Sequence, residues 1–163
     1  MPMNLKRKKV LFLCTGNSCR SQMAEGWARF LKGDVLEPYS AGTVARGLDQ
    51  RAVKVMAEAG VDISGQRSKR IEELEGVQFD LVVTLCGHAQ EHCPVFTGGT
   101  KVAHFPIFDP PALAREARSE EEILAHYRRA RNEIRNLVED LPYGIEEPAP
   151  QVTDASAEMC GRE

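Results

Sequence analysis

The sequence lacks long hydrophobic runs. The apolar stretch from Val10 to Leu13 is too short for the hydrophobic region of a signal peptide. No other stretch approaches the roughly 20 apolar residues of a transmembrane helix. We therefore expect a soluble, cytoplasmic protein that has no membrane partner.

The sequence also lacks a large excess of positive or of negative residues. The chain has 21 Lys and Arg against 24 Asp and Glu, a formal net charge of -3. This balance argues against a broadly basic surface for nucleic acid or anionic lipid. With 163 residues, of which 42% are hydrophobic, we expect one domain over residues 1–141 that acts as a monomer. Residues 142–163 are rich in proline, acidic and small residues, so we expect a disordered tail there.

The sequence also lacks the even number of cysteines that a set of disulfides requires. Its five cysteines are Cys14, Cys19, Cys86, Cys93 and Cys160. An odd number in a chain large enough to fold without cross-links argues against a disulfide framework. We expect thiols that are kept reduced for chemistry, and we assign no role to Cys160 in the predicted tail.

Apolar periodicity predicts alternating strands and helices. Short Val- and Leu-rich runs predict strands at residues 10–13, 35–41, 79–85 and 102–105. Helical spacing predicts helices at 21–33, 49–60, 68–75 and 119–141, with N-caps at Asp49, Ser68 and Ser119. This order is typical of an α/β domain with a four-stranded parallel sheet flanked by helices on both faces.

The segment from Cys14 to Ser21 follows the first predicted strand and leads into the first helix. Ligands of parallel α/β sheets bind beyond the carboxyl ends of the strands. Backbone N–H groups of a tight glycine-containing turn can converge on an anion, and a helix N-terminus adds partial positive charge. Arg20 can clamp two oxygens of the anion. The candidate oxyanion-binding residues are Thr15, Gly16, Asn17, Ser18, Cys19, Arg20 and Ser21.

The same electrostatic field favours a reactive thiolate at Cys14. Helix N-termini and cationic neighbours lower the pKa of a thiol from about 8.5 to about 3.5–7.5. Ser18 and Ser21 are candidate hydrogen-bond donors, and Asn17 tolerates the left-handed conformation that a tight loop requires. A buried, inert Cys14 beside an ordinary surface Arg20 is the alternative. The strand before the loop, the helix after it and the glycine within it disfavour that alternative.

Asp109 is a candidate general acid. It lies in the loop after the fourth predicted strand, where it can protonate a leaving oxygen. An aspartate that only starts the turn at Pro110 and Pro111 is as consistent with the spacing.

The chain contains four motifs: the run from Cys14 to Trp27, the run Tyr39-Ser-Ala-Gly42, the run Leu81-Val-Val-Thr-Leu-Cys86 and the run His92-Cys93-Pro94. Together they resemble the thioredoxin-coupled arsenate reductases over most of residues 10–140. The resemblance implies the fold and anion loop of low-molecular-weight protein tyrosine phosphatases. It implies arsenate as the substrate, phosphate or sulfate as other occupants of the loop, and thioredoxin as the reductant, with no bound cofactor.

The resemblance also implies roles for three cysteines. Cys14 attacks arsenate, Cys86 releases arsenite by forming a disulfide with Cys14, and Cys93 then pairs with Cys86 for reduction by thioredoxin. A phosphatase, which is the alternative function, needs only Cys14, Arg20 and Asp109.

The spacing of Cys86 and Cys93 predicts a conformational change. If the segment were helical, seven residues at 1.5 Å each would separate the two cysteines by about 10 Å. The alpha carbons of a disulfide lie only about 4.4–6.8 Å apart. Oxidation must then unwind the segment.

The chain departs from the resembled family in two places. The family's acid lies in an Asp-Asp-Pro or Pro-Asp-Pro context, which leaves the register of Asp109 open. Some members bind potassium through residues matching Asn17, Glu25 and Ser40, together with a threonine and an aspartate where this chain has Arg67 and Lys69. We infer that the Lys69 ammonium replaces potassium, and expect no metal site.

Two further alternatives concern the other cysteines. Cys86, His88, His92 and Cys93 lie within eight residues, as zinc ligands can, but fit no common ligand spacing. Cys19 can form a protective disulfide with Cys14 or serve as a small buried residue that supports the loop.

Overall fold

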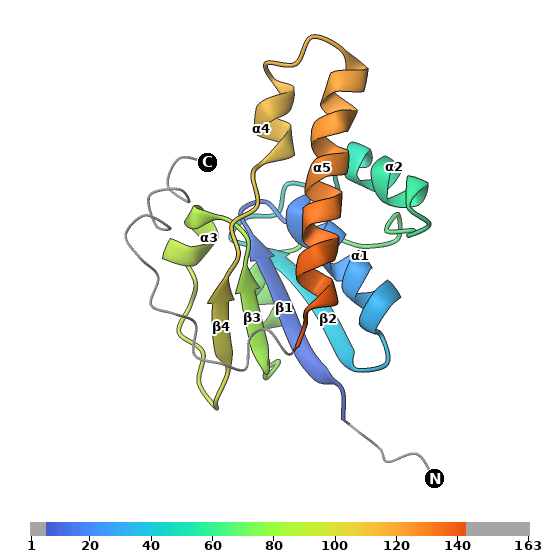
Figure 1. The fold of residues 1–163 in the computed structure, drawn as a ribbon. Helices are drawn as coiled ribbons and strands as arrows, with labels where there is room; N and C mark the ends of the chain where they lie inside the picture. Colours follow the sequence, from blue (N-terminus) through green and yellow to red (C-terminus); the bar gives the residue numbers. More distant parts are fainter. Residues whose placement is uncertain (1–5, 143–163) are drawn as a thin grey trace.

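The computed structural model describes residues 6–142, which contain one four-stranded parallel sheet (Figure 1). The strand order is β2-β1-β3-β4, and every neighbouring pair is parallel. The strands are β1 (Lys8–Cys14), β2 (Leu36–Gly42), β3 (Leu81–Thr84) and β4 (Lys101–His104). The predicted parallel sheet is confirmed. The predicted tail and Cys160 lie outside the described residues, apart from residue 142.

Helices α1 and α5 pack side by side over one face of the sheet (Figure 1). The helices are α1 (Arg20–Lys32), α2 (Gln50–Glu58), α3 (Gly87–Glu91), α4 (Pro110–Ala114), α5 (Glu120–Glu139) and the 3-10 helix η1 (Ile71–Leu74). Within residues 6–142, no helix is long and apolar enough to cross a membrane.

The opposite face of the sheet is also covered. The hydroxyl of Ser40 on β2 bonds Glu25 of α1, so its neighbour Tyr39 points to the other face. There the Tyr39 ring meets Phe79 edge-on, and Phe79 meets Phe96 in the same way. Helix η1 also contacts β2. Both faces are therefore covered as predicted, the second one mainly by a 3-10 helix and an irregular segment.

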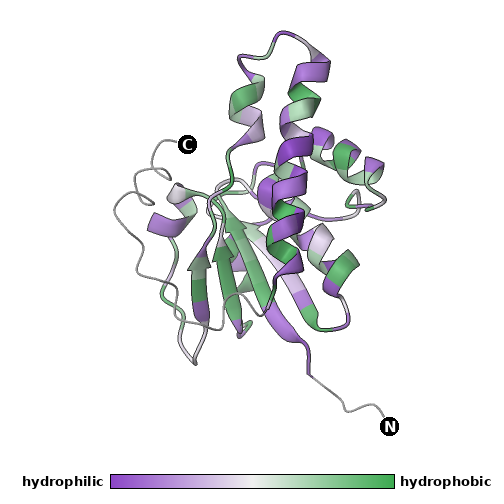
Figure 2. Cartoon of the chain, in the orientation of Figure 1, coloured by the Kyte–Doolittle hydropathy of each residue, from purple (hydrophilic) through white to green (hydrophobic). Residues whose placement is uncertain are grey.

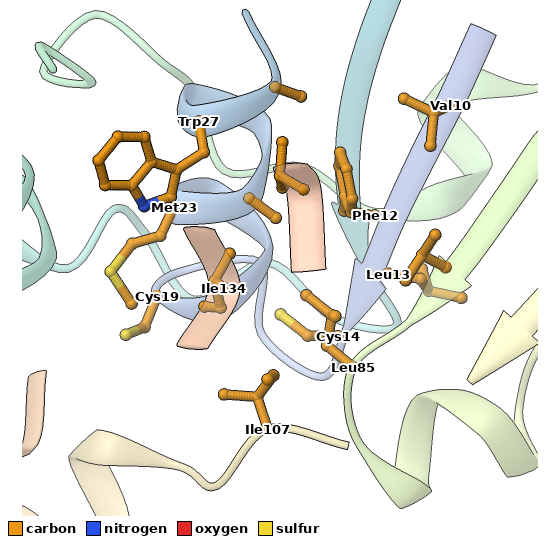
Figure 3. Packing of buried hydrophobic residues seen from close by; sticks show 14 of the residues in the cluster. Val10, Phe12, Leu13, Cys14, Cys19, Met23, Trp27, Leu85, Ile107 and Ile134 are labelled. Carbon is orange, nitrogen blue, oxygen red and sulfur yellow. The ribbon is translucent and has the colours of Figure 1, made fainter. Parts of the chain in front are cut away.

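The centre of the core is β1, from Val10 to Leu13. All four side chains are 0% exposed, although successive residues of a strand point to opposite faces. Figure 2 shows the central strands as largely hydrophobic, whereas hydrophilic and hydrophobic stretches alternate along helix α5. Met23 and Trp27 of α1 pack with Ile134 of α5, and Cys14 lies at the loop end of the same cluster (Figure 3). Met23 and Trp27 are thus core residues, 0% and 1% exposed.

Two predicted caps are confirmed and one is wrong. The Asp49 carboxylate accepts from the N–H groups that start α2, and the Ser119 hydroxyl accepts from Glu122 N. Ser68, in contrast, caps no helix. Its hydroxyl accepts from Gly47 N and donates to Gly16 O, because the chain here passes beside the Cys14 loop. Helix η1 starts instead after Arg70.

Candidate active site

The loop after β1 turns its carbonyl groups outward. The carbonyl oxygens of Cys14, Thr15, Gly16 and Ser18 accept hydrogen bonds from the backbone N–H groups of residues 43, 44, 46 and 49. The carbonyl of Asn17 accepts from the Gln22 side chain. In a trans peptide the N–H points away from the C=O. The N–H groups of residues 15–19 are therefore directed toward the inside of the loop.

Asn17 fixes the shape of this loop and holds Ser21. Its φ of 48° makes it the one non-glycine residue with positive φ in residues 6–142. Its side-chain nitrogen donates to Ser21 Oγ at 2.8 Å, which leaves the Ser21 hydroxyl proton for Cys14 Sγ, also 2.8 Å away. Its side-chain oxygen accepts from Gln22 and from Lys69 N. The predicted left-handed Asn17 is confirmed, and Ser21 contacts the sulfur as expected.

Gly42, at the end of β2, allows the loop to pack against the sheet. A Cβ atom here would lie 2.4 Å from Val44 O, 2.6 Å from Thr15 O and 2.7 Å from Asn17 N. All three atoms belong to the backbone, and two of them belong to the anion loop. Only glycine permits this close approach.

Arg20 is buried at the base of the site, where it is 7% exposed. One guanidinium nitrogen donates to Ile107 O at 2.9 Å, and another lies 3.8 Å from Asp109 Oδ1. Burial lowers the pKa of Arg20, but the neighbouring Cys14 and Asp109 outweigh this effect, so that its pKa lies above the ordinary value. The structure thus places Arg20 and Asp109 together, whichever reaction they support.

Cys86 lies beside the Cys14 loop because β1 and β3 are neighbours. Leu13 pairs with Thr84, so the segments that follow the two strands leave the same edge of the sheet. Cys86 Sγ lies 3.2 Å from the Thr15 hydroxyl, and it accepts a hydrogen bond from Ala89 N at the start of α3. Cys93 follows α3 and is partly buried, which raises the pKa of its thiol.

Cys19 is a buried support of the loop. It is 3% exposed. Burial, followed by the charge of Asp49, raises the pKa of its thiol well above the ordinary value. A protonated, buried thiol is a poor nucleophile, so these findings favour the supporting role over the protective disulfide.

A cavity of about 480 Å³ joins these residues. It is lined by Cys14, Thr15, Gly16, Ser18, Cys19, Arg20, Arg46, Cys86, Gly87, His88, Glu91, Asp109, Pro111 and Arg115. Asn17 and Ser21 support the loop from behind, and Cys93 does not line the cavity. Among residues 6–142, no Phe, Tyr or Trp lines the cavity, and His88 is its one aromatic side chain.

Sequence reasoning missed Arg46, Arg115 and Glu91 as lining residues and did not place His88 at the site. None of these four belongs to the Cys14 loop. Of the four, only Arg46 could have been predicted from the sequence, because it follows shortly after the motif that ends at Gly42.

No group of three or more His, Cys, Asp or Glu side chains in residues 6–142 is placed to hold a metal ion. His88 and His92 stack on each other at 4.1 Å between ring centroids. Lys69 Nζ lies 4.0 Å from Glu25 Oε1, the oxygen that also accepts from Ser40 at 2.6 Å. Burial lowers the pKa of Lys69, which the charge of Glu25 partly offsets.

Comparison with known proteins agrees with this geometry. Residues 9–149 match the low molecular weight phosphotyrosine protein phosphatase family. An arsenate reductase of Bacillus subtilis is 48% identical over 83% of this chain and 96% of the relative. An arsenate reductase of Staphylococcus epidermidis is 41% identical over 83% of this chain and 96% of the relative.

Solved structures of similar proteins include both arsenate reductases and a tyrosine phosphatase. An arsenate reductase in its oxidized state has a TM-score of 0.71 and 32% identity, over 85% of this chain and 99% of that one. A low molecular weight protein tyrosine phosphatase from T. tengcongensis has a TM-score of 0.61 and 29% identity, over 82% and 97%. The chain therefore belongs to the low molecular weight phosphotyrosine protein phosphatase family, and within it to the arsenate reductases.

Proposed function

We propose that this protein reduces arsenate to arsenite by a relay of three cysteines. The Cys14 thiolate attacks the arsenic of arsenate and displaces one oxygen as water, which forms a sulfur–arsenic(V) bond. The Cys86 thiolate then attacks Cys14 Sγ. The sulfur–arsenic bond breaks with its electron pair going to arsenic, so arsenite leaves and a Cys14–Cys86 disulfide remains.

The relay is completed by Cys93. Its thiolate attacks Cys86 Sγ, which forms a Cys86–Cys93 disulfide and releases Cys14 as a thiolate. A protein dithiol, thioredoxin, supplies the two electrons that reduce this disulfide. Because the relay starts and ends with free thiols, we place the protein in the reducing cytoplasm. We also propose that it acts as a monomer.

One observation carries this proposal: Cys86 shares the oxyanion cavity with Cys14. The loop and Arg20 serve a phosphatase equally well, whereas the Cys86 thiol, which lies outside the loop, has no use in phosphate hydrolysis. No Phe, Tyr or Trp of the described residues lines the cavity, which also favours a free inorganic anion over an aryl phosphate. For either reaction we propose Asp109, which lies 3.8 Å from Arg20, as the group that protonates a leaving oxygen.

Helix α3 supports the expected rearrangement. Cys86 caps its N-terminus, and Cys93 lies two residues beyond its last residue. Five of the six residues between them are helical, and we expect this turn to open when a disulfide brings the two alpha carbons within about 4.4–6.8 Å. Faster amide hydrogen exchange at residues 86–100 after oxidation is the expected result. Unchanged exchange would exclude the rearrangement.

The decisive experiment compares reduction with hydrolysis. Arsenate reduction is followed with thioredoxin, thioredoxin reductase and NADPH, beside hydrolysis of an aryl phosphate. Cys93→Ser should stop reduction after one turnover and leave any hydrolysis unchanged, and Cys14→Ser should abolish both. Robust hydrolysis by the wild-type protein without reduction would support the phosphatase alternative.

We also propose that Lys69 occupies the place of a potassium ion. Its ammonium lies beside Glu25 and donates to Arg67 O at 2.9 Å. The reductase should then work equally well in KCl and in NaCl of the same ionic strength. Stimulation by potassium alone would overturn this assignment.

A further inference from the structure

Two arginines stand at the rim of the oxyanion cavity, outside the loop. Arg46 follows β2, and Arg115 follows α4. Arg46 is held over the loop: its backbone N–H donates to Gly16 O, and its stem lies 2.9–3.3 Å from the place where a Gly16 Cβ would be. The backbone and the side-chain stem of Arg46 are thereby held against the loop that forms the oxyanion site.

Neither rim guanidinium has a partner within residues 6–142. Other arginines of the protein are paired, such as Arg51 with Glu120 and Arg128 with Glu58. Arg46 and Arg115 form no hydrogen bond or ion pair through their side chains in the described part of the chain. Their charge is therefore available to an incoming anion.

Arginines outnumber carboxylates around the cavity only when the rim arginines are present. Arg20, Arg46 and Arg115 contribute three positive charges, and Asp109 and Glu91 contribute two negative charges. Loss of one rim arginine would remove this excess of positive charge, and loss of both would leave an excess of negative charge facing a negative substrate. Charges that line a cleft raise the rate of ligand capture by about 10- to 1000-fold.

The cavity is also larger than one oxyanion. Its volume is about 480 Å³. Charges on the rim can therefore attract an ion before it reaches the loop.

We propose that Arg46 and Arg115 form a capture rim, which draws the doubly charged arsenate ion into the cavity before the loop binds it. This proposal rests on the proposed function of the Cys14 loop as an oxyanion site. The pair determines affinity and the rate of capture, while the loop and the cysteines perform the chemistry.

Phosphate protection of Cys14 tests this role without turnover. The reduced protein is alkylated with neutral iodoacetamide at increasing inorganic phosphate, and Cys14 modification is read by peptide mass spectrometry. The double variant Arg46→Gln, Arg115→Gln should need about tenfold more phosphate for half-protection. Added NaCl should weaken protection of the wild type steeply and that of the variant much less. Arg46→Lys, which keeps the charge, should protect nearly as well as the wild type.

Arg118→Gln is the matched control. It removes the same charge three residues beyond Arg115, but Arg118 does not line the cavity. Its half-protection should match the wild type. Equal half-protection in the double variant and the wild type would overturn the capture rim and leave the oxyanion site intact. If phosphate failed to protect even the wild type, the oxyanion site itself would be refuted.

With arsenate as substrate, the double variant should lose about tenfold in kcat/KM and much less in kcat. Equal losses in both constants would instead assign the rim a role in the chemical step, and would also contradict the proposal.

Discussion

Gly42→Ala tests whether the packing of the anion loop against β2 maintains the site. The new methyl group would lie 2.4–2.7 Å from three backbone atoms, two of which belong to the loop. Backbone atoms cannot move aside as a flexible side chain can, so the loop itself must shift. Overpacking typically costs about 1–3 kcal/mol, and three backbone contacts place this variant near the upper end.

The expected loss is measurable in two ways. At about 2–4 °C per kcal/mol for a chain of this length, a loss of about 3 kcal/mol lowers Tm by about 6–12 °C. A displacement of about 1 Å in a binding site can cost 100-fold in function, so phosphate protection of Cys14 should weaken by at least about tenfold. Thermal unfolding and the alkylation assay measure the two effects separately.

Gly65→Ala is the matched control. An added Cβ at Gly65 meets no atom within 4 Å, and the backbone is not in the left-handed region. This variant should keep wild-type phosphate protection and gain up to about 1 kcal/mol of stability, because alanine restricts the unfolded chain. A Gly42→Ala protein with wild-type Tm and wild-type phosphate protection would refute the packing argument.

Three other predictions concern side chains that are fully or partly buried. Tyr127→Phe removes a 2.6 Å hydrogen bond to Asp49, and should lower the free energy of unfolding in urea by about 2 kcal/mol; no change would mean that the bond is not stabilising. Burial lowers the pKa of His104 below its ordinary 6.5. The folded protein therefore binds fewer protons than the unfolded one, and stability should fall as pH drops below about 6.5. His104→Asn should flatten that fall. Iodoacetamide should modify the partly buried Cys93 of the native protein much faster than the buried Cys19; equal rates should appear only in denaturant.

Local sequence signals predicted the elements that have strong caps or apolar faces. Helices α2 and α5 start at their predicted caps because Asp49 and Ser119 bond N–H groups only two or three residues away. The short helices α3 and α4, five residues each, were not predicted. So short a helix has no full apolar face to leave a periodic signal.

The cap at Ser68 was assigned wrongly for a related reason. Serine is favoured both as a helix cap and in contacts with other backbone groups. Its actual partners, Gly47 and Gly16, lie 21 and 52 residues away. A local sequence pattern carries no information about partners so far away in the chain.

The sequence by itself determined the anion loop, from the strand before Cys14 to the arginine at the start of α1, because every part of that loop is contiguous in the chain. Only the tertiary structure decided that Cys86 and Asp109 reach the same cavity, that Gly42 lies against the loop, and that Arg46 and Arg115 form its rim. These groups meet because parallel strands end at one edge of the sheet, which brings together the segments that follow them from distant parts of the chain.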